Sequence, residues 1–391
     1  MTTTRDLAAE LRRAGLADVD DSIRRRAEYS TDASNYRVVP HVVAFPRSTD
    51  EIVAAVEAAR MLGVPITARG GGTSTAGNSI GAGLVLDCSR HLNRVLAVDT
   101  EARTAQAEPG AILDTITEAA APHGLRFGPD PSTHARATIG GSIGNNACGS
   151  RALRYGRTAD NVVALDVLTP SGLRFTARRY GRDGLTSTGP EGALLTAVND
   201  VLAPRLGMVR TEFGRFTRQV SGYSLEHLLP ENGHDLARFL SGTEGTLGVI
   251  LGATVRLVDS PKAVALAVLG YPDMPSAAEA VPGLLPHQPV ALEGMDARLV
   301  NVVRQVGHGR EADRRRRLPR LRDRHRRYRE GAVAHSRGRR RAGRAHTCRG
   351  PSLARLGGRG GSTGAPRGVP ARVREPDVRA PPRWAQLRAL R

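Results

Sequence analysis

The stretch ARGGGTSTAGNS at residues 68–79 decides the fold, and two further glycine-rich stretches support it. These are TIGGSIGNNACGS at residues 138–150 and FLSGTEGTLGVI at residues 239–250. Because glycine lacks a Cβ, such segments let main-chain N–H groups turn toward a ligand and approach anionic oxygens closely. One such loop alone is more often a plain flexible turn. Three of them between strand-like runs predict a backbone that wraps a large anionic cofactor.

The charge of the chain divides it near residue 302. Residues 1–301 hold 30 Lys and Arg against 32 Asp and Glu, a net charge of −2, whereas residues 302–391 hold 27 Arg against 6 acidic residues, a net charge of +21. Leu, Val, Ile and Phe make up about 14% of that last part, below the roughly 20% under which burial fails to offset chain entropy. We therefore predict a disordered basic tail over residues 307–391.

The tail shows no repeat, no aromatic interleaving and no helical stripe of the kind found in nucleic-acid modules. Our preferred interpretation is a reading-frame shift near residue 307, which leaves the chain truncated and continues it out of frame. The alternative is a nucleic-acid-binding arm, because 27 arginines attract phosphate backbones without sequence preference. Any nucleic-acid contact by the tail is expected to be non-specific.

The sequence lacks the usual motifs of several protein classes. Lys262 is the only lysine, so no GxxxxGK[ST] phosphate loop exists, and GxSxG, HExxH, EF-hand and strand–GxGxxG–helix patterns are absent. Cys88, Cys148 and Cys348 are too few and scattered for a disulfide framework or an iron–sulfur site, and no metal site is predicted. The sequence shows no signal peptide and no apolar run of membrane-span length, so we predict a cytoplasmic protein without a membrane span.

Local patterns predict alternating helices and strands. Ser48 or Thr49 caps a helix that ends at Gly63, and the strand that follows runs directly into the first glycine stretch. The remaining expected elements are helices over 5–29, 111–124 and 193–202, strands over 42–45, 65–68, 84–87, 94–99 and 247–257, and a hairpin formed by NVVALDVLTPSG and LRFTA. Beyond Lys262, AVALAVLGY, a helix at about 276–285 and PVALEG are typical of the opening strand, helix and strand of another domain.

Seven motifs occur in order and with suitable spacing: FPRSTDEI, ARGGGTSTAGNS, LDCSRHLNRVLAVD, EPGA, FGPDPST, GGSIGNNACGSRALRYGRTADNV and SGTEGTLGVI. Over about residues 30–300 the chain resembles the PCMH-type FAD-binding domain shared by vanillyl-alcohol oxidase and p-cresol methylhydroxylase, specifically its D-lactate and glycolate dehydrogenase branch. The resemblance implies an α+β fold with a two-lobed FAD-binding domain over 36–260, whose lobes cover about 36–95 and 96–257. An N-terminal helical segment, 1–35, precedes it, and the start of a truncated α+β cap domain, 261–306, follows.

Carried over position by position, the resemblance implies a set of FAD-binding residues in which backbone amides do most of the holding. The set is Arg69, Gly70, Gly71, Gly72, Thr73, Ser74, Gly77, Asn78, Pro129, Ser132, Thr133, Gly140, Gly141, Ser142, Gly144, Asn145, Asn146, Gly149, Ser150, Asp160, Val162, Glu244, Gly245, Gly248 and Ile250. Family members that attach FAD covalently through the first loop carry a histidine where Thr73 stands, so noncovalent FAD is expected.

The resemblance also implies a reaction. Such enzymes transfer a hydride from the α-carbon of a D-2-hydroxy acid, such as D-lactate or glycolate, to the flavin while a base takes the hydroxyl proton. The family places these groups on the cap, in an H-x-GDGN-x-H type segment, and no GDGN occurs in this chain. A missing base costs ~10² to 10⁴ in rate, so we expect impaired oxidation, name no catalytic residue and leave the electron acceptor unknown. The alternative is a non-catalytic flavin-binding remnant.

Overall fold

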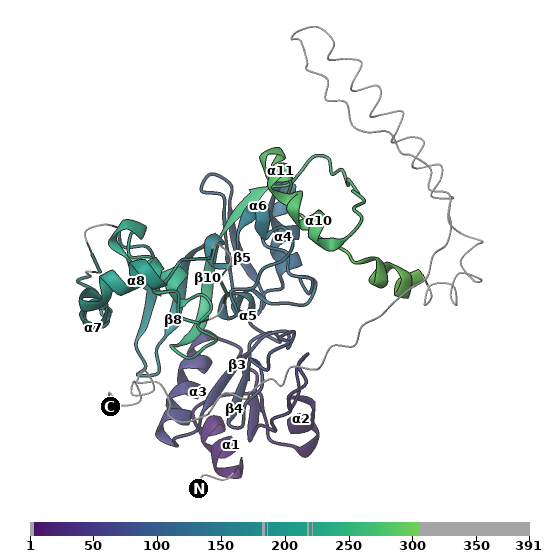
Figure 1. Ribbon diagram of the computed structural model, residues 1–391. Coiled ribbons are helices and arrows are strands. Elements are labelled where there is room, and N and C mark those ends of the chain that lie inside the picture. Colours follow the sequence, from purple (N-terminus) through teal and green to yellow (C-terminus); the bar gives the residue numbers. More distant parts are fainter. Residues whose placement is uncertain (1–3, 182–183, 186, 217–218, 221, 305–391) are drawn as a thin grey trace, which may run out of the picture. The chain divides into compact units, whose positions relative to one another are not determined.

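The computed structural model describes residues 4–181, 184–185, 187–216, 219–220 and 222–304 (Figure 1). They belong to one compact unit, residues 1–309. The predicted tail over 307–391 and the predicted frame shift near residue 307 lie outside the described residues. Across the part that is described, no helix has the length and apolar character needed to cross a membrane.

The first lobe is built on a sheet of strand order β1-β2-β4-β3. Strands β2, β4 and β3 run parallel, and β1 pairs antiparallel with β2. Its elements are α1 (Thr4–Arg13), β1 (Val19–Asp20), α2 (Ile23–Glu28), β2 (Val42–Ala44), α3 (Thr49–Met61), β3 (Ile66–Arg69) and β4 (Leu84–Asp87). The predicted cap of α3 is confirmed, because the Ser48 side chain accepts a hydrogen bond from the Glu51 backbone N–H.

The single helix predicted over residues 5–29 is wrong. Helix α1 ends at Arg13, and Gly15 adopts a φ of +97°, a conformation that turns the chain out of the helix and that side chains disfavour. The chain then forms the short strand β1 before Ser22 caps α2. The apolar side that suggested one continuous helix, Leu7, Leu11 and Leu16, is buried in the core of the first lobe.

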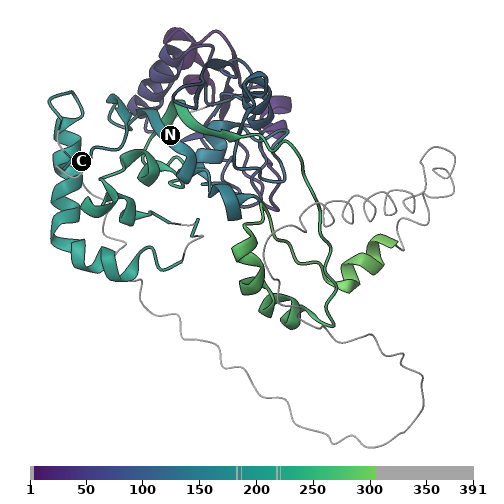
Figure 2. The same cartoon turned by 90° about the horizontal axis from the view of Figure 1, so that it is seen from above.

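The second lobe is built on an antiparallel sheet of strand order β5-β6-β10-β8-β9, with β7 pairing to the far end of β10. Figures 1 and 2 show helices α7 and α8 on the side of this lobe that carries β8. Its elements are β5 (Val95–Asp99), β6 (Thr104–Ala107), α4 (Leu113–Ala120), β7 (Leu125–Phe127), α5 (Ile139–Gly144), α6 (Ala152–Tyr155), β8 (Val162–Leu168), β9 (Arg174–Ala177), α7 (Gly192–Leu202), α8 (Leu206–Glu212), α9 (Leu236–Leu240) and β10 (Val249–Asp259).

Apolar packing joins the two lobes. One buried cluster combines α1 and α3 with the strands of the first sheet, and it also includes Leu168 and Leu251 from β8 and β10 of the second. The other fills the second lobe between its sheet and helices α4, α5, α7 and α9. The predicted two-lobed α+β fold is confirmed, and shared packing sets the two lobes side by side.

The stretch after β10 differs from its prediction. Residues 263–271 and 289–294, expected as two strands, form no strand. Between them the expected helix is present in two short pieces, α10 (Met274–Glu279) and α11 (Val281–Leu284). A β-strand requires a hydrogen-bonded neighbour, and within the described residues no strand pairs with these segments.

Candidate functional site

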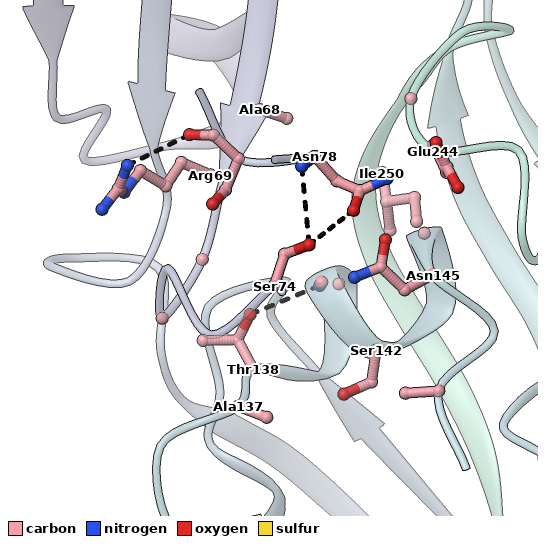
Figure 3. Close-up of a pocket in the computed structure, with 18 of the residues that line it drawn as sticks. Ala68, Arg69, Ser74, Asn78, Ala137, Thr138, Ser142, Asn145, Glu244 and Ile250 are labelled. Carbon is pink, nitrogen blue, oxygen red and sulfur yellow. Dashed lines mark hydrogen bonds between the residues drawn. The ribbon is translucent and has the colours of Figure 1, made fainter. Parts of the chain in front are cut away.

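A cavity of about 520 Å³ lies where the three glycine-rich stretches meet (Figure 3). The first stretch leaves the carboxyl end of β3, the second contains α5, and the third leads into β10. All three therefore reach the cavity from the ends of regular elements, which hold their backbones in place. The volume falls within the range of about 300–1,000 Å³ that is usual for ligand sites.

Residues 29–36 contact the first stretch and hold it in place. Arg69 Nη1 donates to the carbonyl oxygens of Thr31 (3.0 Å) and Ser79 (3.1 Å), and its guanidinium carbon lies 4.8 Å from the centre of the Tyr29 ring. Figure 3 shows this side chain pointing away from the labelled residues Ser74 and Asn145. Arg69 thus binds the two ends of its own loop to the N-terminal segment, and its charge is not aimed into the cavity.

A second contact fastens the same loop. Asp32 accepts hydrogen bonds from the Ser79 backbone N–H (3.4 Å) and hydroxyl (3.0 Å), and Ala33 N–H donates to the Gly72 carbonyl (3.2 Å). Burial alone would raise the pKa of Asp32, but hydrogen bonds from Ser34 and Ser79 outweigh it and lower that pKa. The carboxylate is therefore ionised at neutral pH, and it keeps both contacts.

Two positions of the first stretch require glycine because its backbone lies very close to residues 136–138. A Cβ on Gly70 would lie 2.0 Å from Thr138 Oγ1, and one on Gly71 would lie 2.2 Å from the carbonyl oxygen of Arg136. Both distances are far inside van der Waals contact. The first stretch consequently packs directly against the segment that enters α5, and Thr138 caps that helix by accepting from the Gly141 N–H at 3.3 Å.

The third stretch docks on the end of α5. Gly242 N–H donates to the Ile143 carbonyl (2.8 Å), and Glu244 N–H donates to the Gly144 carbonyl (3.0 Å). Glu244 and Gly245 both have positive φ, +55° and +75°. Two left-handed residues in succession reverse the chain sharply, which brings the following residues, Gly248 and Ile250, to the cavity wall.

The lining favours an anion held by main-chain groups. Among the described residues that line the cavity, Arg69 and Glu244 are the only charged ones, and the Arg69 guanidinium is already bound by carbonyls. The Ser142 hydroxyl is buried at the wall and has no hydrogen-bond partner within the described residues. An unpartnered buried hydroxyl is costly unless a ligand pairs with it. The residues present therefore fit a large polar cofactor.

Residues 40–178 match the family model described as the FAD binding domain. This region is a PCMH-type FAD-binding domain. Among similar proteins, the D-2-hydroxyglutarate dehydrogenase of Pantoea ananatis is 33% identical over 300 residues, which cover 74% of this chain and 29% of that protein. The glycolate oxidase subunit GlcD of Bacillus subtilis is 32% identical over 299 residues, covering 75% and 54%.

A third relative, the D-lactate dehydrogenase of Anaerostipes hadrus, is 28% identical over 286 residues, which cover 72% of this chain and 50% of that protein. The chain therefore spans about half the length of the glycolate and D-lactate relatives, and 29% of the D-2-hydroxyglutarate dehydrogenase. The similarity covers the FAD-binding domain and the residues around it.

The structure brings most of the predicted FAD-binding residues to one cavity, although their contact with FAD stays a prediction. Those that line it are Arg69, Gly70, Gly71, Gly72, Thr73, Ser74, Asn78, Thr133, Gly140, Gly141, Ser142, Gly144, Asn145, Glu244, Gly245, Gly248 and Ile250. Within this set, Ser74 donates to Asn78 Oδ1 at 2.5 Å and accepts from the Ala76 N–H at 3.2 Å, which closes the turn of the first stretch.

Eight predicted residues do not line the cavity: Gly77, Pro129, Ser132, Asn146, Gly149, Ser150, Asp160 and Val162. Some have evident structural contacts. The Asn146 side chain accepts from the Ala159 N–H at 2.9 Å, and a Cβ on Gly149 would lie 2.0 Å from the Asp130 carbonyl oxygen. These two positions shape loops next to the cavity.

Asp160 is bound to two arginines instead of facing the cavity. Arg157 Nε lies 3.1 Å from Asp160 Oδ2, and Arg238 Nη2 pairs with the other carboxylate oxygen. Burial would raise the pKa of Asp160, but the hydrogen bonds from Arg157 and the charge of Arg238 lower it. The carboxylate links the segment after α6 to α9.

The cavity also includes residues that the sequence reasoning missed. Thr138 and Pro109 line it; Thr138 opens the second glycine-rich stretch, and Pro109 stands within the motif EPGA. Val220, Leu240 and Thr243 line it as well, and no motif marks Val220. Cys88 lies at the wall, where burial first, and the adjacent Asp87 second, raise the pKa of its thiol to about 12.

Proposed function

We propose that this chain is an FAD-dependent oxidoreductase that acts on a D-2-hydroxy acid and holds its FAD noncovalently. The observation that carries the proposal is the junction of the three glycine-rich stretches around one cavity, and two of these stretches lie within the matched FAD-binding domain. The substrate class is taken from the relatives, whose names refer to D-2-hydroxyglutarate, glycolate and D-lactate. A cytoplasmic location and an unidentified electron acceptor belong to the same proposal.

Noncovalent attachment is supported by the cavity wall. Thr73, which lines the cavity, stands where covalent family members carry histidine, and a threonine hydroxyl is a weak nucleophile. Cys88 is the cysteine at the wall among the described residues, and a thiol with a raised pKa is largely un-ionised near neutral pH. Neither group is suited to form a bond to the flavin.

The chain's own residues would bind and orient the cofactor. Backbone amides of residues 70–74 and the Ser142 hydroxyl are the groups suited to its polar atoms, and Glu244 and Gly245 close the cavity from the third stretch. Bound FAD would supply the hydride acceptor for oxidation of an alcohol carbon. We assign no proton acceptor and no substrate-carboxylate clamp among the described residues.

The test is to purify the full chain, add FAD, remove the excess and record the visible absorption spectrum. Acid precipitation should leave the yellow colour in the supernatant if the cofactor is noncovalent. Anaerobic addition of D-2-hydroxyglutarate, D-lactate or glycolate should bleach the flavin, but slowly, because no base is assigned to take the hydroxyl proton; L-lactate serves as the control. Retained flavin without bleaching by any of the three acids would contradict the oxidoreductase proposal but keep FAD binding. Failure to retain flavin would contradict both.

A further inference from the structure

A second cavity, of about 340 Å³, lies in the second lobe next to the first cavity. Its walls come from helices α7, α8 and α9 and from strands β8 and β9. The described residues that line it are aliphatic or aromatic, except for Thr169 and Arg205. Figure 1 shows α7 and α8 beside β8, where this cavity is formed.

Ordered water is a poor occupant for this cavity. A buried water molecule needs two to four polar partners, and Thr169 is the only polar uncharged side chain among the described residues that line the cavity. Its hydroxyl already hydrogen-bonds to the Ser171 hydroxyl (2.8 Å) and accepts from the Leu173 N–H (3.0 Å). Val201, which lines the cavity, is 51% exposed, so the cavity opens to solvent and its apolar wall faces water. An apolar occupant removes that wall from water, which is favourable.

Arg205 supplies a charged end to the cavity. Its side chain is exposed between α7 and α8, and its guanidinium donates one hydrogen bond, from Nη1 to the Val201 carbonyl (2.7 Å). Within the described part of the chain, no carboxylate lies within ion-pair distance of it. A guanidinium has five N–H donors, so most of this group is free to bind an anion.

We propose that this second cavity binds a medium-chain aliphatic monocarboxylate, with the chain among the leucines and valines and the carboxylate on Arg205. The pattern of a long apolar wall with one cation at its edge selects an amphipathic acid. A neutral hydrocarbon would leave the guanidinium unused, and a short polar acid would leave the apolar wall uncovered.

An occupant of this site would also touch the wall of the FAD-binding cavity. Val167 and Leu240 line both cavities, one from β8 and one from α9. A ligand in the second cavity therefore packs against the opposite side of two side chains that face the first. The proposal does not depend on FAD, because the apolar wall and Arg205 are present without a ligand in the first cavity.

The test is isothermal titration of octanoate into the full chain, with octanol as the uncharged analogue. We expect saturable octanoate binding, weakened roughly tenfold by Arg205→Gln, which removes a charged hydrogen bond, with octanol affinity unchanged. Ala197→Phe places a ring in the cavity and should weaken both ligands by at least about tenfold, since it occupies their apolar contacts. Ala193→Phe is the matched control on α7, outside the lining, and should leave both affinities unchanged.

Circular dichroism confirms that each variant is folded. Absence of saturable octanoate binding, or equal losses with Ala193→Phe and Ala197→Phe, would overturn the proposal. The titration is run on flavin-free and FAD-loaded protein. Binding to the flavin-free form supports the fatty-acid site even if FAD-dependent activity fails, so the two proposals are tested separately.

Discussion

Strand β4 and residues 263–269 have similar apolar sequences, LVLD and AVALAVL, yet they adopt different structures. In β4, Leu84, Val85 and Leu86 are fully buried, and the strand pairs in parallel with β2 on one side and β3 on the other. In the later stretch Leu266 and Val268 are 84% and 85% exposed, and no strand forms.

The difference shows that apolar, β-branched sequence is not sufficient for a strand. Backbone N–H and C=O groups of a strand are satisfied by neighbours distant in sequence. β4 has such neighbours because α3 returns the chain to the same sheet, whereas residues 263–269 have none within the described structure. The contrast defines two regions, residues 40–259 and residues 261–304. Matched substitutions, one in each region, test whether the first region contributes more to stability and to FAD binding than the second.

The largest expected difference is between two leucine truncations. Leu86→Ala removes a side chain that is fully buried, so the free energy of unfolding should fall by about 2–5 kcal/mol. Leu266→Ala removes one that is 84% exposed and should change it by less than about 0.5 kcal/mol. Urea unfolding followed by circular dichroism measures both. Comparable losses would mean that residues 261–304 pack as firmly as the sheet.

A second comparison uses two histidines and pH. His227 is buried, and burial first, then the charges of Arg238 and Arg157, lower its pKa from 6.5 to about 4. The unfolded state therefore binds more protons between these values, so the free energy of unfolding should fall as pH is lowered from 6.5 to about 4, by roughly 3 kcal/mol. His227→Gln should flatten this dependence.

His287, exposed in the later region, is the matched control for His227. Urea unfolding at a series of pH values measures the slope. An unchanged slope in His227→Gln would show that this histidine is not the group that titrates.

A third comparison concerns glycines and FAD affinity. Gly71→Ala places a Cβ 2.2 Å from the Arg136 carbonyl oxygen, so the first stretch must move away from the entry of α5. FAD affinity should fall by about tenfold, or ~1.4 kcal/mol. Gly283→Ala meets no atom within 4 Å and should not alter it. Flavin fluorescence titration measures both affinities. Equal FAD affinities of the two variants would show that the close contact at Gly71 does not matter for FAD binding.

The smallest expected difference is between two helix caps. Ser48 caps α3, which buries five side chains, so Ser48→Ala should lower the free energy of unfolding by about 1 kcal/mol. Asp273 caps α10 in the same way, but α10 buries none. Asp273→Ala should therefore leave the global unfolding transition in place. A shift of that transition by Asp273→Ala would show that α10 contributes to the cooperative core.

Local signals predicted much of the fold. Ser48, Gly63 and the apolar positions between them predicted α3, and Gly124, with a φ of +69°, ends the helical segment after α4 as expected. These features depend on neighbours a few residues away. The break at Gly15 and the helix α5 inside the second glycine stretch were missed, because a glycine permits both a turn and a close packing contact.

The candidate site, like the fold, was predicted in part from the sequence. The order and spacing of the glycine-rich motifs predicted which segments meet, and 17 of the 25 predicted residues line one cavity. The direction of individual charged side chains was not predictable from the motifs. Arg69 faces residues 29–36 and Asp160 faces Arg157 and Arg238, because partners distant in sequence compete for each charge.

The amino-acid sequence by itself determined helix α3 with its Ser48 cap, the end of the helical segment at Gly124 and the places where glycine gathers, since these properties follow from residues close along the chain. The tertiary structure alone decided that AVALAVLGY forms no strand, that Arg69 fastens a loop to the N-terminal segment, and that a second apolar cavity opens beneath α7. Those outcomes depend on which distant groups come within bonding and packing distance, and short-range pattern does not specify such neighbours.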